Sequence, residues 1–114
     1  MTTTDVYAGF VAAIRAVSDP EVILLFGSRV RGDAREDSDF DLLVVASKDN
    51  WKLPSRRLEI TRLRQALPRN CSIDVLLYTP TEVDEWRGGL NHVIARAFEE
   101  GRILYECNHA SQLE

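Results

Sequence analysis

The strongest constraint on the fold of this chain is a set of three short apolar runs, each of strand length and bounded by turn-forming residues. The runs lie in the segments EVILLFGS (21–28), FDLLVVAS (40–47) and SIDVLLYT (72–79). Short runs rich in Val, Ile and Leu are typical of buried β-strands. The segment RILYE (102–106) predicts a fourth, shorter strand.

Helical patterns separate these strands in the sequence. Apolar residues recur at helical spacing over residues 5–18 and 54–67, and a proline ends each pattern. The same spacing predicts a helix over residues 90–100, which Gly101 ends. Strands that alternate with helices predict an α/β (α+β) fold, with a mixed sheet of about four strands flanked by helices.

A further short helix is predicted with Thr81 as its N-cap and Asp84 as an acidic residue of its first turn, and it is expected to run through Trp86. Tryptophan is enriched at interfaces, yet most tryptophans of small domains lie in or beside the core. We interpret Trp86 as such a residue and leave the place of Trp51 open. His92 has no partner at ligand spacing, so we interpret it as structural.

Composition and length exclude several classes of protein. The 114 residues fit one domain, which we expect over residues 1–106, followed by a short flexible tail over residues 107–114. No apolar run is long enough to cross a membrane, and the N-terminus lacks a secretory signal pattern. Cys71 and Cys107 form neither a disulfide framework nor a metal-binding pair. We therefore expect a cytoplasmic protein with no membrane partner. The net charge of −4 disfavours binding of long nucleic acid.

The segment FGSRVRGDAREDSDFDLLVV (26–45) is the most informative for function. In it a strand runs directly into Gly27-Ser28. Gly27 lacks the Cβ that would keep a ligand from the backbone, and Ser28 is suited to open a phosphate-binding turn. Most Gly-Ser pairs after a strand are nevertheless simple turns, so this pair alone has two interpretations.

Three carboxylates give that segment a chemical interpretation. Asp39 and Asp41 are two residues apart on a strand, so both point to the same face. Asp74 lies in another, otherwise apolar strand. If the two strands are neighbours, three carboxylates lie together, and hard oxygen ligands are those that Mg²⁺ prefers. The alternatives are solvated charge at the exposed end of a strand for the pair and a loop cap for Asp74.

Taken together, these residues resemble the signature of the nucleotidyltransferase superfamily that shares the DNA polymerase β palm fold. That signature is Gly-Ser, ten residues, Asp-x-Asp, and a later Asp on a further strand, as in GSRVRGDAREDSDFD with Asp74. Arg31-Gly32 also matches the minimal nucleotidyltransferase (MNT) branch, which includes the antitoxins of HEPN/MNT toxin–antitoxin systems. Val30 departs from the alanine usual in that branch.

The resemblance implies a nucleotide site. Gly27 and Ser28 would hold the β- and γ-phosphates of ATP. Arg29 and Arg31 are candidates for further contacts to the triphosphate. The alternatives are that both arginines are solvated, or paired with acidic residues of the same loop, namely Asp33, Glu36 and Asp37.

The resemblance also implies a metal and catalytic site. Asp39, Asp41 and Asp74 would bind Mg²⁺, with two ions expected, and Asp74 would help to deprotonate the acceptor hydroxyl. Phosphoryl and nucleotidyl transfer depend mainly on positioning and charge neutralisation, which agrees with this set of residues.

The partner implied by the resemblance is a cognate HEPN-domain RNase toxin. The chain would act as its antitoxin by transferring AMP from ATP to a toxin hydroxyl, expected to be a tyrosine. A small palm domain would borrow part of its acceptor site from that partner. Two alternatives remain: transfer to a small molecule such as an aminoglycoside, and inhibition of a toxin by binding alone. Fold decides none of these.

Overall fold

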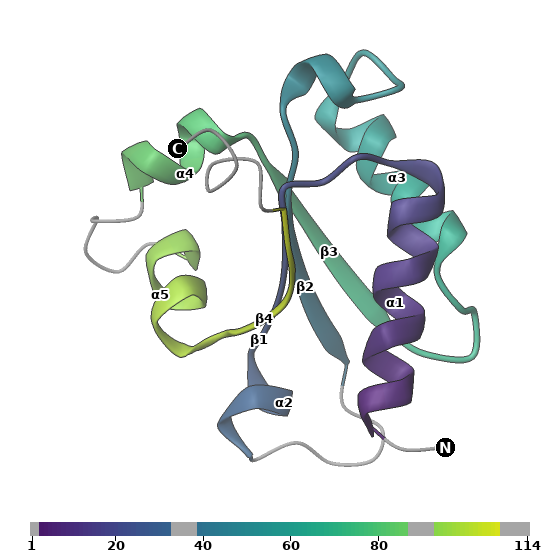
Figure 1. Cartoon of the computed structure of the whole chain (residues 1–114), viewed down its shortest axis with the longest axis vertical. Helices are drawn as coiled ribbons and strands as arrows, with labels where there is room; N and C mark the ends of the chain where they lie inside the picture. The colour runs from purple at the N-terminus through teal and green to yellow at the C-terminus, as the bar shows by residue number, and fades with distance from the viewer. Residues whose placement is uncertain (1–2, 33–38, 87–92, 108–114) are drawn as a thin grey trace.

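The fold is built on a four-stranded mixed sheet (Figure 1). The computed structural model describes residues 3–32, 39–86 and 93–107. The strands are β1 (Val22–Phe26), β2 (Phe40–Val45), β3 (Ile73–Tyr78) and β4 (Arg102–Glu106), in the spatial order β3-β2-β1-β4. β1 pairs antiparallel with β2 and β4, while β2 pairs parallel with β3. The four predicted strands and the mixed sheet are confirmed.

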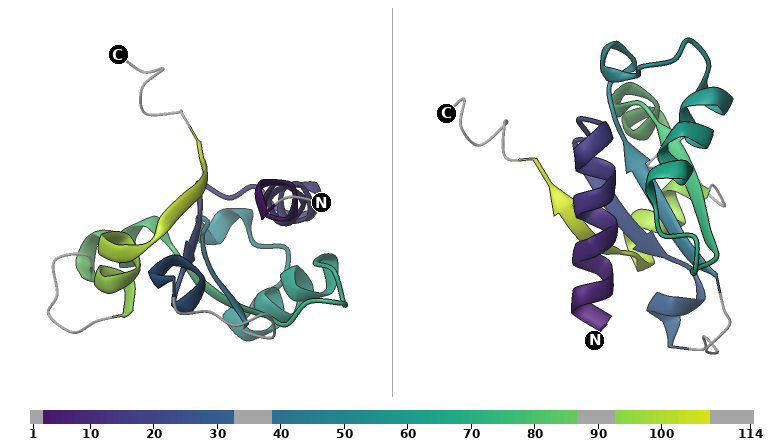
Figure 2. Two further views of the ribbon diagram at one scale, coloured as in Figure 1. Left: turned by 90° about the horizontal axis from the view of Figure 1, so that it is seen from below. Right: turned by 90° about the vertical axis from the view of Figure 1, so that its right-hand side faces the viewer.

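Helices cover both faces of the sheet (Figure 2). α1 (Thr3–Val17) and α3 (Arg56–Ala66) lie on one face, and α4 (Pro80–Trp86) and α5 (Val93–Glu100) lie on the other. Two short turns, α2 (Ser28–Arg31) and η1 (Lys48–Asn50), follow β1 and β2. The predicted α/β fold is therefore confirmed. The first residues of the helix predicted over 90–100 lie outside the described residues.

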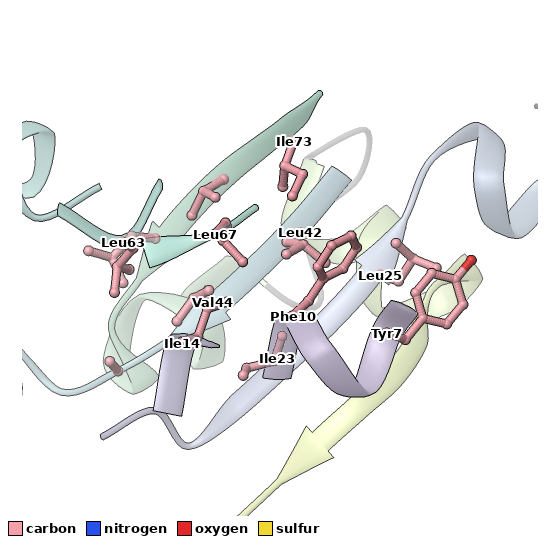
Figure 3. Close-up of a cluster of buried hydrophobic side chains, with 13 residues drawn as sticks. Tyr7, Phe10, Ile14, Ile23, Leu25, Leu42, Val44, Leu63, Leu67 and Ile73 are labelled. Carbon is pink, nitrogen blue, oxygen red and sulfur yellow. The ribbon is translucent and has the colours of Figure 1, made fainter. Parts of the chain in front are cut away.

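Successive side chains of the central strands enter two different hydrophobic cores. Leu42 and Val44 of β2 belong to the core beneath α1 and α3 (Figure 3). Leu43 and Val45 belong to the core beneath α4 and α5. Because β2 is covered on both faces, its sequence is a continuous apolar run rather than an alternating one.

α4, the helix that ends at Trp86, begins two residues earlier than predicted. Its N-cap is Thr79, not Thr81: the Thr79 hydroxyl accepts a hydrogen bond from the Glu82 N–H (3.2 Å). The Glu82 carboxylate in return accepts one from the Thr79 N–H (2.9 Å). This reciprocal capping box leaves Pro80 at the first helical position, where its missing N–H costs nothing.

α3 is also shorter than the predicted span of 54–67. Ser55 is its N-cap, since the Ser55 hydroxyl accepts a hydrogen bond from the Leu58 N–H (3.1 Å). The chain is extended at Leu67, which caps the other end.

The two tryptophans differ in exposure. Trp86 is 45% exposed, so the prediction that it lies in or beside the core is wrong. Val83 is the buried residue of α4, and the last turn of that helix extends beyond the core. Trp51 is half-buried against the first core, and its indole N–H donates to the Ala46 carbonyl (3.1 Å). His92 and residues 108–114 of the predicted tail lie outside the described residues.

No helix in the described part of the chain is both long and apolar enough to span a lipid bilayer.

One buried carboxylate was not foreseen from the sequence. Glu59 of α3 is 1% exposed. It accepts hydrogen bonds from the N–H groups of Lys52 and Leu53 (both 3.2 Å) and pairs with Arg62 (2.6 Å). The Arg62 guanidinium lowers the pKa of Glu59 below its ordinary value of 4.5. Glu59 thus fixes the chain before α3 to the helix itself.

We expect Glu59→Gln to lower the free energy of unfolding by about 2 kcal/mol at neutral pH, because Arg62 then loses a buried partner. The stability advantage of the wild type is fully present above pH 4.5 and is lost as the pH falls below that value, since the carboxylate with the lowered pKa must then be protonated. Chemical denaturation at several pH values measures both effects.

Glu100→Gln is the matched control, because Glu100 pairs with Arg96 on the exposed surface of α5. Its effect should stay within about 0.5 kcal/mol. Equal losses in the two variants would contradict the anchoring role of Glu59.

Candidate functional site

Three carboxylates lie at one end of the sheet. Asp41 of β2 is directly opposite Asp74 of β3 in the parallel ladder, and Asp39 comes just before β2. Because side chains alternate along a strand, Asp41 shares the face of Leu43, which packs beneath α4 and α5. The condition that the two strands are neighbours is met by the pairing of β2 with β3.

The three carboxylates differ in burial. Asp39 and Asp74 are exposed, and Asp41 is half-buried. The exposure of Asp39 matches the alternative of solvated charge at a strand end, stated for the pair of Asp39 and Asp41, whereas the half-burial of Asp41 does not. Among the described residues, no three His, Cys, Asp or Glu side chains are close enough to hold one metal ion together. The backbone therefore aligns the carboxylates, while their side chains are not gathered around a common point.

Gly27 brings the end of β1 into direct contact with Asp41. The backbone of Gly27 has φ 82° and ψ −154°, a region that only glycine adopts readily. Phe26, one residue earlier, pairs with Asp41 in the antiparallel ladder. A Cβ on residue 27 would lie 3.2 Å from the Asp41 Cγ and closer still to its Oδ2. Ser28 then begins α2.

Arg29 packs on the aromatic residue of β2 that precedes Asp41. Its guanidinium stacks 4.1 Å from the centroid of the Phe40 ring. Phe40 points to the face of α1, where its ring contacts Tyr7 and Phe10, while Asp41 points to the other face. The predicted contact between Arg29 and a triphosphate stays a prediction.

The remaining residues predicted for this loop are only partly described. Arg31 is the last residue of α2 and Val30 packs against the first core. Asp33, Glu36 and Asp37, considered as partners of the arginines, lie outside the described residues.

Comparison with known proteins identifies the family. The sequence profile of the family described as polymerase beta, nucleotidyltransferase, matches residues 12–110. The chain belongs to this family. The resemblance noted in the sequence is thereby confirmed. No curated protein sequence matches the chain significantly.

Solved structures of similar fold include a toxin–antitoxin complex with AMP-PNP, at TM-score 0.61 and 19% identity over 94% of this chain and 78% of that one. A Sulfolobus solfataricus protein assigned to the nucleotidyltransferases gives TM-score 0.61 and 18% identity over 93% and 82%. A mutant of the toxin–antitoxin pair MntA–HpeT gives 0.60 and 17% over 94% and 78%. At these identities, the similarity shows a common fold.

The residues at the end of this nucleotidyltransferase sheet are of the chemical types that bind a divalent cation and a nucleotide, although the three carboxylates do not converge on one point. Asp39, Asp41 and Asp74 supply hard carboxylate oxygens, the ligands that Mg²⁺ prefers. Gly27 brings the backbone of the strand-to-helix turn against one of these carboxylates. A triphosphate at the turn and a cation at the carboxylates would therefore be neighbours.

Two features of the site were missed in the sequence. The contact of Gly27 with Asp41 depends on the register of β1 against β2, for which the sequence has no signal. The stacking of Arg29 on Phe40 did have a sequence signal, because the middle side chain of Asp-Phe-Asp on a strand points to the face opposite its neighbours.

We expect Gly27→Ala to destabilise the fold by about 1–3 kcal/mol, because alanine is strained at positive φ and its Cβ would displace the Asp41 carboxylate. Thermal or chemical denaturation measures the loss.

Gly9→Ala is the matched control. Gly9 is an exposed residue of α1 with nothing within 4 Å of its missing Cβ. Alanine there should stabilise the helix by about 0.5–1 kcal/mol. A Gly27→Ala protein as stable as the wild type would contradict the close approach of β1 and β2.

Proposed function

We propose that this nucleotidyltransferase is an antitoxin that transfers AMP from ATP, with Mg²⁺, to a hydroxyl of a cognate HEPN RNase toxin, a tyrosine being the expected acceptor. The observation that carries the proposal is the alignment of Asp41 with both Gly27 and Asp74 across three neighbouring strands. A phosphate-binding turn, a central carboxylate and a further carboxylate then follow one another along the end of the sheet.

This order across the sheet supports a division of roles. Gly27 and Ser28 of the turn after β1 hold the β- and γ-phosphates. Asp39 and Asp41 bind the metal, and Asp74 on β3 faces the acceptor. Mg²⁺, expected as two ions, would neutralise the phosphate oxygens and polarise the α-phosphate for attack.

The transfer step follows from these places. The acceptor oxygen forms a bond to the α-phosphorus, the bond from that phosphorus to the oxygen bridging to the β-phosphate breaks, and pyrophosphate leaves. The Asp74 carboxylate takes the proton of the hydroxyl. Asp74 is exposed, so a bulky acceptor can reach it.

Both arginines of the turn are proposed to contact the triphosphate. Arg29 also stacks on Phe40, which ties α2 to β2 and would hold the turn at Ser28 in place. Arg31 is the last residue of the same turn.

The similar structures support the choice of partner. One is a toxin–antitoxin complex with AMP-PNP, an ATP analogue, and another is the pair MntA–HpeT. Inhibition by binding alone is the second candidate, and the carboxylate side chains that do not share one metal position favour it.

The decisive experiment is a transfer assay with ATP labelled in its adenine and Mg²⁺. The purified protein is mixed with the neighbouring gene product or with lysate of its own cell. We expect label on one protein band, and a loss of at least about 100-fold in Asp39→Asn and Asp41→Asn, because each removes a metal ligand.

Asp84→Asn is the matched control, since Asp84 is an exposed aspartate of α4 away from the carboxylate row. It should transfer AMP as the wild type does. Unchanged activity in the Asp39 and Asp41 variants would refute the metal assignment. Tight association with the partner without label would favour inhibition by binding. Label in a small molecule would favour an acceptor of the aminoglycoside type.

Ser28→Ala tests the phosphate-binding turn separately. We expect the dissociation constant for ATP to rise about fivefold, which corresponds to the loss of one hydrogen bond. Isothermal titration with ATP and Mg²⁺ measures it. Ser47→Ala is the control, because Ser47 makes no capping hydrogen bond and lies at the opposite end of β2. Equal affinities in all three proteins would remove Ser28 from the nucleotide site.

A further inference from the structure

A basic hollow lies where the end of α3 meets the start of β3. Its volume is about 600 Å³. Arg64, Arg69, Gln65, Asn70 and Ser72 contribute polar groups to its lining, and none of the described residues of that lining is a carboxylate or an aromatic residue. Such a lining favours a ligand with negative charge.

The arginines at this hollow differ from the other arginines of the protein. Arg56, Arg62 and Arg96 each pair with a glutamate. Arg15, Arg29 and Arg102 each stack on an aromatic ring. Over the described parts of the chain, the exposed side chains of Arg57, Arg64 and Arg69 have neither kind of partner.

Two of these arginines, Arg64 and Arg69, line the hollow, and Arg57 lies farther along the same helix. Arg57 and Arg64 lie two helical turns apart on the same side of α3, and Arg69 follows the helix in the loop that lines the hollow. Their charges are uncompensated in a chain whose net charge is −4. Arginine forks bind carboxylates in a bidentate manner, which makes this surface complementary to an acidic segment.

The hollow lies next to the proposed acceptor position. Ser72 and Ile73 line the hollow, and Asp74 follows them in the chain. Ile73 packs into the core beneath α1 and α3, so Asp74 points to the opposite face of β3. β3 is an edge strand of the sheet (Figure 1). A chain held in the hollow therefore reaches Asp74 by passing over one strand at the edge.

We propose that this hollow is the docking surface for an acidic segment of the protein that accepts the nucleotide. This inference rests on the proposed function and adds to it the charge of the acceptor. Single-stranded nucleic acid is the other class of polyanion, but its bases bind by stacking on aromatic side chains, and the lining has none among the residues that the structure describes.

The probe for this surface is a fluorescein-labelled random copolymer of glutamate and tyrosine, whose binding is followed by fluorescence anisotropy without ATP or Mg²⁺. We expect Arg64→Glu/Arg69→Glu to raise its dissociation constant at least about tenfold, because two ion pairs become repulsions. Binding to the wild type should also weaken as salt rises. Arg96→Glu, at an exposed arginine of α5, should change the constant less than about twofold.

An unchanged dissociation constant in Arg64→Glu/Arg69→Glu, or an equal rise in Arg96→Glu, would overturn the docking surface. The proposal would also be overturned if an oligoadenylate displaced the copolymer, bound more tightly than it, and lost affinity for the same double variant. Isothermal titration with ATP should give equal affinities in the wild type and the double variant, and a loss there would assign the arginines to the nucleotide instead.

The two proposals fail in different ways. If the wild type binds the copolymer through Arg64 and Arg69 but transfers no AMP, the transferase proposal is refuted and the docking-surface proposal stands. If the wild type and the double variant transfer AMP to the partner with the same KM for that partner, the transferase proposal stands and the docking-surface proposal is refuted.

Discussion

The contact between Gly27 and Asp41 is the constraint on which the rest of the candidate site depends. A side chain on residue 27 would occupy the place of the Asp41 carboxylate, and the backbone there has a positive φ. Any other residue would therefore have to displace that carboxylate and adopt a strained backbone. Because Asp41 is also in register with Asp74 of β3, a displaced Asp41 carboxylate would change its spacing to the next carboxylate of the row. The glycine thus leaves free the place in which the central carboxylate lies.

The alternation of side chains along β2 places the candidate metal ligand and the packing residues on opposite faces of the strand. Asp41 points to one face, while Phe40 just before it joins the aromatic contacts with α1. Farther along the same strand, both faces are covered and every side chain is buried. Polar groups are therefore confined to the end of the strand, where the chain leaves the two cores. Arg29, stacked on Phe40, ties the helical turn after β1 to that same end.

The sequence predicts the parts of this structure that depend on local pattern. Apolar runs locate three of the strands, β1, β2 and β3, and a family signature with unusual spacing identifies the nucleotidyltransferase. Features that depend on long-range contacts are different. Glu59 lies in a helix of otherwise ordinary pattern, and only the loop at Lys52 and Leu53 folded against it explains its burial. The exposure of Trp86 is a second example, because nothing in the sequence indicates that the last turn of its helix extends beyond the core.

The position of β3 at the edge of the sheet joins two surfaces of opposite charge. The carboxylates lie on the face of α4 and α5, and the unpartnered arginines lie with α3 on the other side of the same strand. An acidic acceptor would be repelled by the carboxylate row alone, so attraction has to come from elsewhere on the surface or from a bound cation. With arginines around the edge of β3, the protein can hold the acceptor at one place and present its hydroxyl at another. Binding and chemistry would then be separated by the width of a single strand.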